Sequence, residues 1–213
     1  VESPFDYQQQ ALLCLPRYLP ESHANNMPHA IIKLTLELIK SAKGRCFVLF
    51  TSYRMMHLVA EGLTTQMDYP VYMQGQMSKR IILEKFTRHG NAVLLGTASF
   101  WEGVDVRGST LSCVIIDKLP FAAPDDPLLQ AKMQDCQLQG KDPFAHIQLP
   151  QAVIALKQGV GRLIRDKNDK GALIICDNTL VTREYGGVFL ASLPPIPRTR
   201  DLALVQDFLE HNQ

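Results

Sequence analysis

Two features that ATP-hydrolysing chains carry are missing from this sequence. No segment of its 213 residues matches the phosphate-binding loop G-x-x-x-x-G-K-[ST], and no D-E-A-H-type segment is present to hold magnesium. The nearest glycine–basic pairs lack the required spacing: Gly44-Arg45, Gly140-Lys141 and Lys170-Gly171. The chain on its own is therefore not expected to hydrolyse ATP.

The chain also has little net charge. It carries 22 Lys and Arg against 21 Asp and Glu, which gives a formal net charge of +1. This balance provides no global attraction for nucleic acid, so any DNA-binding surface must be a local patch. The segment 157–170 is one candidate, with five basic and two acidic residues. An ordinary solvated helix has the same composition, and that alternative stays open.

Cysteines and long apolar runs are also scarce. None of the five cysteines has metal-ligand spacing, so no metal site is expected: Cys14, Cys46, Cys113, Cys136 and Cys176. Isolated thiols in apolar runs behave as small hydrophobes, and their odd number indicates a reducing, cytoplasmic setting. We find no signal peptide and no apolar stretch long enough to span a membrane. Because the chain begins at Val1, we expect a domain excised from a longer protein.

Predicted strands and helices alternate along most of the chain. Short apolar runs predict strands near 10–15, 45–51, 70–73, 92–97, 111–117 and 171–177. Periodicity and capping residues predict helices at 28–42, 53–67, 78–88, 127–140, from 150 onward and at 201–210. This alternation is typical of an α/β domain whose mostly parallel sheet is covered by helices on both faces.

The octet from Gln158 to Arg165 reads Q-x-x-G-R-x-x-R. If it is helical, Gln158, Arg162 and Arg165 lie at i, i+4 and i+7 and share one face. Two arginines that repel each other, with glycines inside a helix, carry local penalties that a bound oxyanion would offset. The alternative is a solvated face on which Asp166 and Asp169 pair with the arginines, and the octet alone favours neither.

A second polar stretch, 96–105, follows the apolar run 92–95. Loops at the carboxyl ends of parallel strands are where ligands bind in open α/β sheets. Several side chains of this loop suit a nucleotide or nucleic acid. Hydroxyls, carboxylates and aromatic rings are supplied by Thr97, Ser99, Phe100, Trp101, Glu102 and Asp105.

These two stretches resemble motifs V and VI of superfamily 2 helicases, specifically the DinG/XPD-like group of ATP-dependent DNA helicases. The resemblance runs nearly end to end, with Val48 to Tyr53 as motif IV. It also includes Ser3 to Phe5, the segment Lys118 to Pro127, and Leu149 to Ala152 before motif VI. Four motifs in order make the resemblance strong. It implies a RecA-like, P-loop NTPase-like domain without its own P-loop.

The resemblance implies roles for individual residues. The catalytic set would be Arg165 as the arginine finger, Arg162 as its partner, and Gln158 orienting water or phosphate. The nucleotide would be contacted by the loop residues Asp105, Glu102 and Gly103 and by Gly161. DNA would be contacted by two groups of residues: Thr51, Ser52 and Tyr53, and Thr97, Ser99 and Trp101. Ser52 as a plain helix cap and Trp101 packed under its own loop are the simpler alternatives.

The same resemblance divides the chain and names its partners. Residues 1–27 would connect from a first motor domain, and 28–213 would form the second RecA-like domain, with 124–150 as a family-specific helical elaboration. The first domain would hold ATP and Mg²⁺ and could carry an iron–sulfur cluster. Expected partners are that domain, single-stranded or forked DNA, and the chi subunit of the replicative polymerase. We expect a bacterial cytoplasmic, nucleoid-associated location.

Function is therefore expected to be that of a motor. The parent would translocate on single-stranded DNA, in the 5′-to-3′ direction, in DNA repair or replication-fork rescue. A competing hypothesis is a non-catalytic RecA-like docking module that binds a replication or repair protein. A dinucleotide-binding domain is less well supported, because Thr51 to Arg54 follow the strand where a glycine-rich loop is required.

Overall fold

A computed structural model describes residues 5–21, 24–97, 100, 106, 111–123, 125–161 and 163–212. Its centre is a seven-stranded sheet in the order β3-β4-β2-β5-β6-β1-β7, and every described strand pair is parallel. The strands are β1 (Ala11–Cys14), β2 (Cys46–Phe50), β3 (Val71–Met73), β4 (Val93–Thr97), β5 (Cys113–Ile116), β6 (Gly171–Ile175) and β7 (Arg198–Thr199). The predicted α/β class is confirmed.

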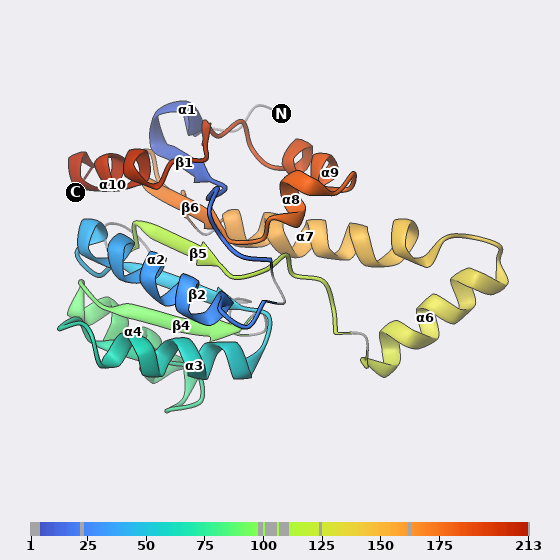
Figure 1. Ribbon diagram of the computed structural model, residues 1–213, viewed down its shortest axis with the longest axis horizontal. Helices are drawn as coiled ribbons and strands as arrows, with labels where there is room; N and C mark the ends of the chain where they lie inside the picture. The colour runs from blue at the N-terminus through green and yellow to red at the C-terminus, as the bar shows by residue number, and fades with distance from the viewer. Residues whose placement is uncertain are drawn as a thin grey trace.

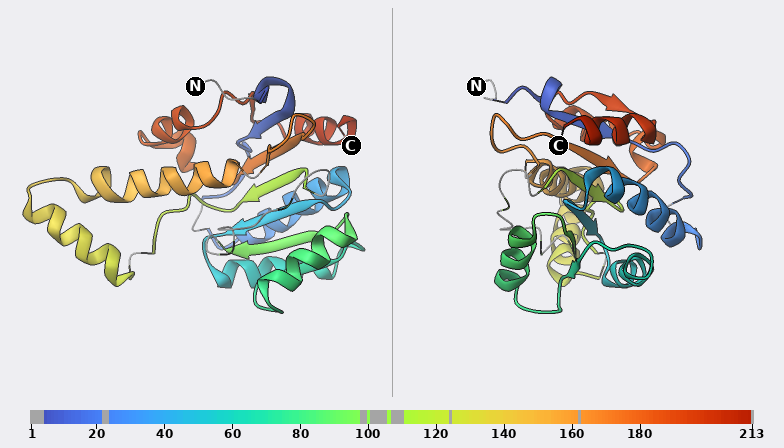
Figure 2. Two further views of the ribbon diagram at one scale, coloured as in Figure 1. Left: turned by 180° about the vertical axis from the view of Figure 1, so that it is seen from behind. Right: turned by 90° about the vertical axis from the view of Figure 1, so that its left-hand side faces the viewer.

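Helices cover both faces of this sheet (Figures 1 and 2). They are α1 (Tyr7–Gln10), α2 (Met27–Ala42), α3 (Tyr53–Thr64), α4 (Lys79–His89), α6 (Pro127–Leu138), η2 (Phe144–Gln148), α7 (Leu149–Val160), α8 (Thr179–Thr182), α9 (Gly186–Ser192) and α10 (Leu202–His211). The segment η2 is a π-helix that runs directly into α7.

The strands are apolar throughout because both of their faces are buried. All five residues of β2 are buried, and alternate ones point to opposite sides. Phe47 and Leu49 join the core beneath α4, α7, α8 and α9. Cys46, Val48 and Phe50 join the core beneath α2, α3 and α10. The sheet thus separates two apolar layers.

Local sequence determines several element boundaries. The Ser52 hydroxyl accepts a hydrogen bond from Met55 N at 3.2 Å, and the Asp126 carboxylate caps α6. Gly44 closes α2 with φ of +81°, and a Cβ there would lie 2.3 Å from the Asn91 carbonyl oxygen. Only glycine fits this tight passage from α2 to β2.

Some predicted details were wrong or missing. Ser78 begins α4 without a side-chain capping bond, and Ile81 is exposed rather than inward. The short elements α1, α8, α9 and β7 were not predicted. The predicted strand in the connecting segment is confirmed as β1, and it lies inside the sheet between β6 and β7.

The segment from α6 to the start of α7 projects away from the body of the domain (Figures 1 and 2). A cluster of aromatic rings packs where this projection meets the body. Phe121 lies 5.8 Å from Phe144 and 5.7 Å from both Tyr185 and Phe189, measured between ring centroids. Among the described helices, none is sufficiently long and apolar to cross a bilayer.

Candidate functional site

The carboxyl edge of the sheet brings predicted DNA-contacting residues of β2 and β4 close together. Phe50 and Thr97 are register partners at the ends of these strands, and Thr51, Ser52 and Tyr53 follow directly. Gln74, which follows β3, links them. Its Oε1 accepts from Thr97 N at 2.7 Å and from Thr97 Oγ1 at 3.0 Å, and its Nε2 donates to the Tyr53 hydroxyl at 2.7 Å.

Gln74 was not among the site residues predicted from the sequence. Its position directly after a predicted strand was the one available sign, because the carboxyl ends of parallel strands meet at one edge. The Ser52 capping bond was anticipated as the simpler role of that residue. The capping bond does not test whether Ser52 also contacts DNA.

Two buried carboxylates support the same edge. Asp117, 1 % exposed, follows β5, and its Oδ1 accepts from Thr51 N at 2.9 Å and from Lys118 N at 2.7 Å. Asp177 follows β6 and accepts from Leu119 N at 3.0 Å. Burial raises the pKa of Asp117 to about 7, although bonds from Lys118 and Thr51 oppose the shift. By accepting these hydrogen bonds, the two carboxylates fix the main chain where it leaves β2 and β5.

The predicted helical face of motif VI is wrong. Helix α7 ends at Val160 and Gly161 is its C-cap, so Gln158 and Arg165 do not share a face of one helix. Leu163 and Ile164 are both 3 % exposed, and the burial of these apolar side chains takes the chain out of the helix into the core. Gln158 remains exposed within α7, and Arg165 is half-buried beyond its end.

A closed turn holds the main chain at Arg165. Asp169 Oδ2 accepts from Arg165 N and from Asp166 N, both at 2.9 Å. The buried Gln10 amide donates to the carbonyls of Asp166 and Asp169 at 2.8 and 2.9 Å. Because Gln10 directly precedes β1, this turn lies at the amino ends of the strands. It is on the opposite edge from Thr51 and Thr97.

Several predicted residues lie outside the described part of the chain. They are Ser99, Trp101, Glu102, Gly103, Asp105 and Arg162. Their roles in contacting the nucleotide, contacting DNA or taking part in catalysis stay predictions.

Comparison with known proteins identifies the family of the chain. The family model for the helicase C-terminal domain matches residues 35–196. The chain belongs to the DinG/XPD-like helicase C-terminal domains. Across 97% of the chain it is 58% identical to the ATP-dependent DNA helicase YoaA of Escherichia coli. Over 97% it is 37% identical to the ATP-dependent helicase DinG of Mycobacterium tuberculosis.

The helicase domain spans about a third of these relatives, 32% of YoaA and 31% of DinG. Solved structures show the same fold. An apo XPD structure superposes with a TM-score of 0.66 at 23% identity, covering 90% of this chain and 40% of that one. The C-terminal domain of the DEAD-box protein Dbp5 gives 0.57 at 13% identity, covering 97% and 98%. The predicted RecA-like fold is thereby confirmed.

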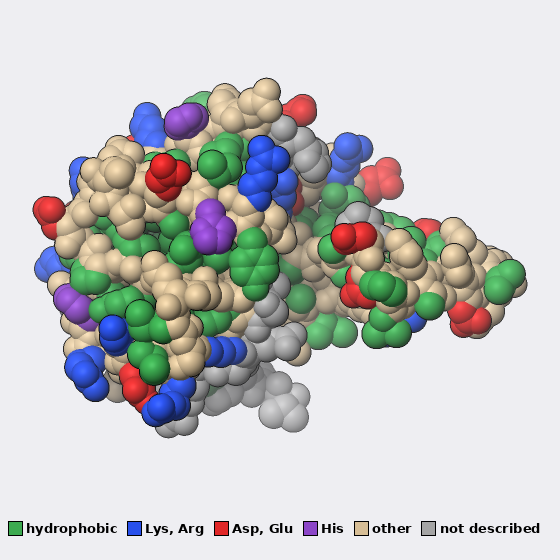
Figure 3. Space-filling view, turned by 90° about the horizontal axis from the view of Figure 1, so that it is seen from below, with side chains coloured by type: hydrophobic (Ala, Val, Ile, Leu, Met, Phe, Trp, Pro, Cys, Tyr) green, Lys and Arg blue, Asp and Glu red, His purple; other side chains and the backbone are tan. Residues whose placement is uncertain are grey.

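Helix α4 of the helicase domain begins beside the carboxyl edge, five residues after Gln74, and carries four Lys and Arg against one Glu. Lys79 and Arg80 lie at this end, and because β3 and β4 are parallel the helix then runs back toward the amino edge. Figure 3 shows Lys and Arg scattered over the body together with acidic side chains, whereas the projection shows mostly hydrophobic and uncharged surface with several acidic side chains. Lys79 and Arg80 place positive charge at this edge, which a chain of near-zero net charge needs locally to bind phosphates.

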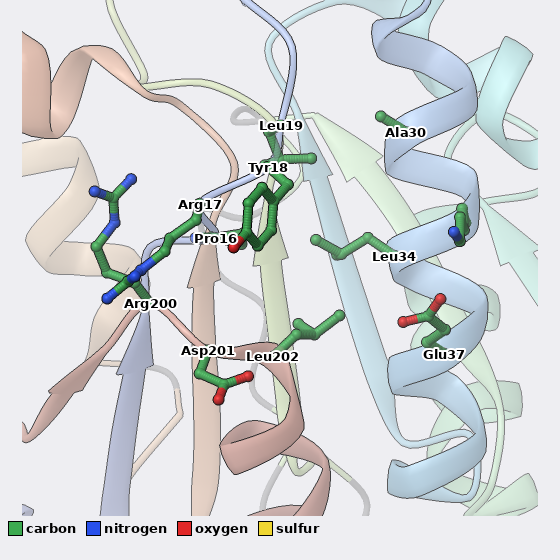
Figure 4. A pocket seen from close by; sticks show the side chains of 11 residues that line it. Pro16, Arg17, Tyr18, Leu19, Ala30, Leu34, Glu37, Arg200, Asp201 and Leu202 are labelled. Atoms are coloured by element: carbon green, nitrogen blue, oxygen red, sulfur yellow. The ribbon is translucent and has the colours of Figure 1, made fainter.

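A separate groove of about 510 Å³ lies between α2, the segment after β1 and the start of α10 (Figure 4). It holds charges of both signs, from Arg17, Lys33 and Arg200 and from Glu37 and Asp201. None of the predicted site residues lines it. Within the described residues, no group of three or more His, Cys, Asp or Glu could hold a metal ion.

Proposed function

We propose that this domain is the second motor domain of an ATP-dependent DNA helicase. The observation that carries the proposal is the closed turn at Arg165, which fixes the main chain of the motif VI arginine beyond the end of α7. A finger must be preorganised to act on a transition state, and a turn tied to β1 and β6 supplies that rigidity. The parent is an ATP hydrolase in this proposal.

Phosphoryl transfer spreads charge over the γ-phosphoryl oxygens, so positioning and electrostatics do most of the catalysis. ATP and Mg²⁺ are held mainly by the first motor domain. When the domains close, Arg165 and Arg162 reach the γ-phosphate, and the exposed Gln158 amide orients water or bonds a phosphate oxygen. Asp105, with Glu102, Gly103 and Gly161, shapes the nucleotide contact. An iron–sulfur cluster, where present, belongs to the first part of the protein.

The carboxyl edge is the proposed DNA surface. Thr51, Ser52 and Tyr53 follow β2 beside Thr97 there, Gln74 links Tyr53 to Thr97, and α4 begins next to them with Lys79 and Arg80. Hydroxyl groups and main-chain N–H groups suit the phosphodiester backbone of a single strand. Ser99 and Trp101 are further proposed DNA contacts, with the indole stacking on a base.

Alternate closing and opening around ATP would move the two domains along single-stranded DNA. We propose 5′-to-3′ translocation in DNA repair or fork rescue, in bacterial cytoplasm at the nucleoid, by analogy with the group. Forked DNA and the chi subunit of the replicative polymerase are further proposed partners. The proposed chi partner is checked by co-purification with the full-length protein: chi should remain bound through a high-salt wash.

The decisive experiment is ATP hydrolysis by the full-length protein with and without single-stranded DNA. Wild type is compared with Arg165→Ala and with Arg183→Ala, a control that removes an exposed arginine elsewhere. We expect DNA-stimulated hydrolysis that falls roughly 10³- to 10⁵-fold in Arg165→Ala alone. ATP affinity stays near wild type because the finger acts on the transition state.

Two other results have clear meanings. Near-normal turnover in Arg165→Ala removes the finger assignment. A folded wild type without hydrolysis favours the alternative, a non-catalytic docking module for a replication or repair protein.

A further inference from the structure

The edge strand β3 ends in an unusual way. Gln74 N donates to Leu95 O at 2.9 Å, as the next residue of a parallel ladder should. The main chain then turns away, because Gly75 adopts φ of +95°. The main-chain carbonyl of Gln74 therefore does not make the last hydrogen bond that a regular ladder would have at this position.

The side chain of Gln74 makes the missing bond. In a regular parallel ladder, a residue opposite Gly96 donates to Leu95 O and accepts from Thr97 N. Here Gln74 Oε1 accepts from Thr97 N at 2.7 Å and also from Thr97 Oγ1 at 3.0 Å. Because the Thr97 main-chain nitrogen can only donate, the amide oxygen must face β4 and the amide nitrogen must face away.

That outward nitrogen reaches Tyr53. Gln74 Nε2 donates to the Tyr53 hydroxyl oxygen at 2.7 Å. The phenol then accepts one hydrogen bond and keeps its own proton for a further acceptor. The Tyr53 side chain is open to solvent, with 53% of the residue's surface exposed. A phosphate oxygen of a bound strand is an acceptor of the right kind.

The geometry points to Gln74 as a positioning residue for nucleic acid. It holds the Tyr53 hydroxyl and the start of the loop after β4 in one fixed arrangement against the phosphodiester backbone of a single strand. This inference rests on the proposed function of the carboxyl edge and adds a residue that links its two halves. We name Tyr53, Gln74 and Thr97 the relay.

A purely structural role for Gln74 is less well supported because the turn has its own clamp. Gln76 Oε1 accepts from Met73 N at 3.0 Å, and Gln76 N donates to Met73 O at 3.2 Å. Closure of the turn therefore does not depend on the Gln74 side chain. Gln76 is a matched control, since it is the same residue type in the same turn and has no bond to Tyr53 or Thr97 among the described contacts.

The test uses the full-length protein and a fluorescent oligothymidylate. Its readouts are the dissociation constant for DNA, the DNA concentration that half-activates ATP hydrolysis, kcat at saturating DNA, and Tm. The variants are Gln74→Ala, Gln74→Glu, Tyr53→Phe, the pair Tyr53→Phe with Gln74→Ala, and the control Gln76→Ala. Unstimulated hydrolysis is measured alongside.

We expect Gln74→Ala to weaken DNA binding roughly 3- to 10-fold, the loss of one or two hydrogen bonds. Activation should need correspondingly more DNA, with kcat at saturation unchanged. Gln74→Glu keeps an acceptor for Thr97 N but loses the donor to Tyr53 and brings a negative charge toward phosphate. It should therefore fold normally yet bind DNA more weakly than Gln74→Ala at low salt, and the gap should narrow as salt rises.

The double variant, Tyr53→Phe with Gln74→Ala, measures the energetic coupling between these two residues in DNA binding. If Gln74 acts through the Tyr53 hydroxyl, Gln74→Ala costs less DNA affinity in the Tyr53→Phe background than in wild type. DNA affinity in Gln74→Glu equal to wild type, or equal losses in Gln74→Ala and Gln76→Ala, overturns the relay while leaving the motor function intact. A wild type without DNA-stimulated hydrolysis overturns the proposed function itself. Should Gln74→Ala fail to fold, Gln74→Glu alone decides the question.

Discussion

Asp117 shows how one residue can support a binding edge at a cost in stability. Its buried carboxyl accepts from Thr51 N and Lys118 N, yet desolvation outweighs these bonds and raises its pKa to about 7. The protonated form is therefore favoured in the folded state over a wide pH range. Near neutral pH, the chain keeps a partly ionised group inside the sheet edge.

The sign of the resulting pH dependence follows from linkage. The folded pKa lies above the ordinary value of 3.8, so the contribution of Asp117 to stability is fully present below about pH 4. It is lost as pH rises through 7. We predict that Asp117→Asn, which cannot ionise, gains stability relative to wild type by roughly 2–3 kcal/mol between pH 5 and pH 8.

Urea unfolding of this chain at the two pH values measures that difference. Asp125→Asn, which alters an exposed carboxylate, is the control and should show no such change. A difference between Asp117→Asn and wild type that stays constant with pH contradicts the prediction.

Individual residues were predictable from sequence when their role was local. The Ser52 and Asp126 caps follow from residue type and from the apolar pattern after them. Gln74 was not predictable in this way, because its partners lie 21 and 23 residues away and meet it only through the β3–β4–β2 register. The end of α7 was missed because it depends on the burial of Leu163 and Ile164 in a core that the sequence does not display.

Among the elements, long periodic segments were predicted and short ones were not. Helix α2 has enough turns to show its period, and strands β2 and β4 stand out as continuous apolar runs. The four-residue helices α1 and α8 show none, and β7 lies in a proline-rich stretch that reads as a turn. Tertiary contacts determine these short elements, as they do the π-helix before α7.

The projecting element depends on the aromatic cluster at its base. Phe121 contacts Phe144, Tyr185 and Phe189, which belong to η2, the turn before α9 and α9. We predict that Phe121→Ala destabilises the chain by about 1–3 kcal/mol, because a half-buried ring and three ring pairs are lost. Hydrogen exchange should accelerate in 127–148 and stay unchanged in β2 and β4.

Phe121→Leu retains most of the apolar volume and should lose less than half as much stability. Uniform acceleration of exchange across the whole sheet in Phe121→Ala would show that the cluster supports the body rather than the projection.

At the scale of the whole molecule, the two proposed sites occupy opposite edges of one sheet. The Arg165 turn is bonded to Gln10 at the amino end of β1, and the relay lies at the carboxyl ends of β2 and β4. Strands of four or five residues separate the edges by roughly 15 Å. A domain built this way can hold its arginine finger and a strand of DNA at once, with the rigid sheet between them.

This separation predicts independence when no nucleotide is bound. Without ATP, Arg165→Ala should leave the affinity for single-stranded DNA within about twofold of wild type, and Tyr53→Ala should lower it. The double variant should bind DNA as weakly as Tyr53→Ala alone, since distant sites without shared partners do not couple directly. With a non-hydrolysable ATP analogue, closure of the two motor domains links the edges, and Arg165→Ala should then also change DNA affinity. Fluorescence anisotropy in the two conditions distinguishes these cases. An Arg165→Ala variant that loses DNA affinity in the absence of nucleotide would place the arginine on the DNA surface and reverse the assignment of the two edges.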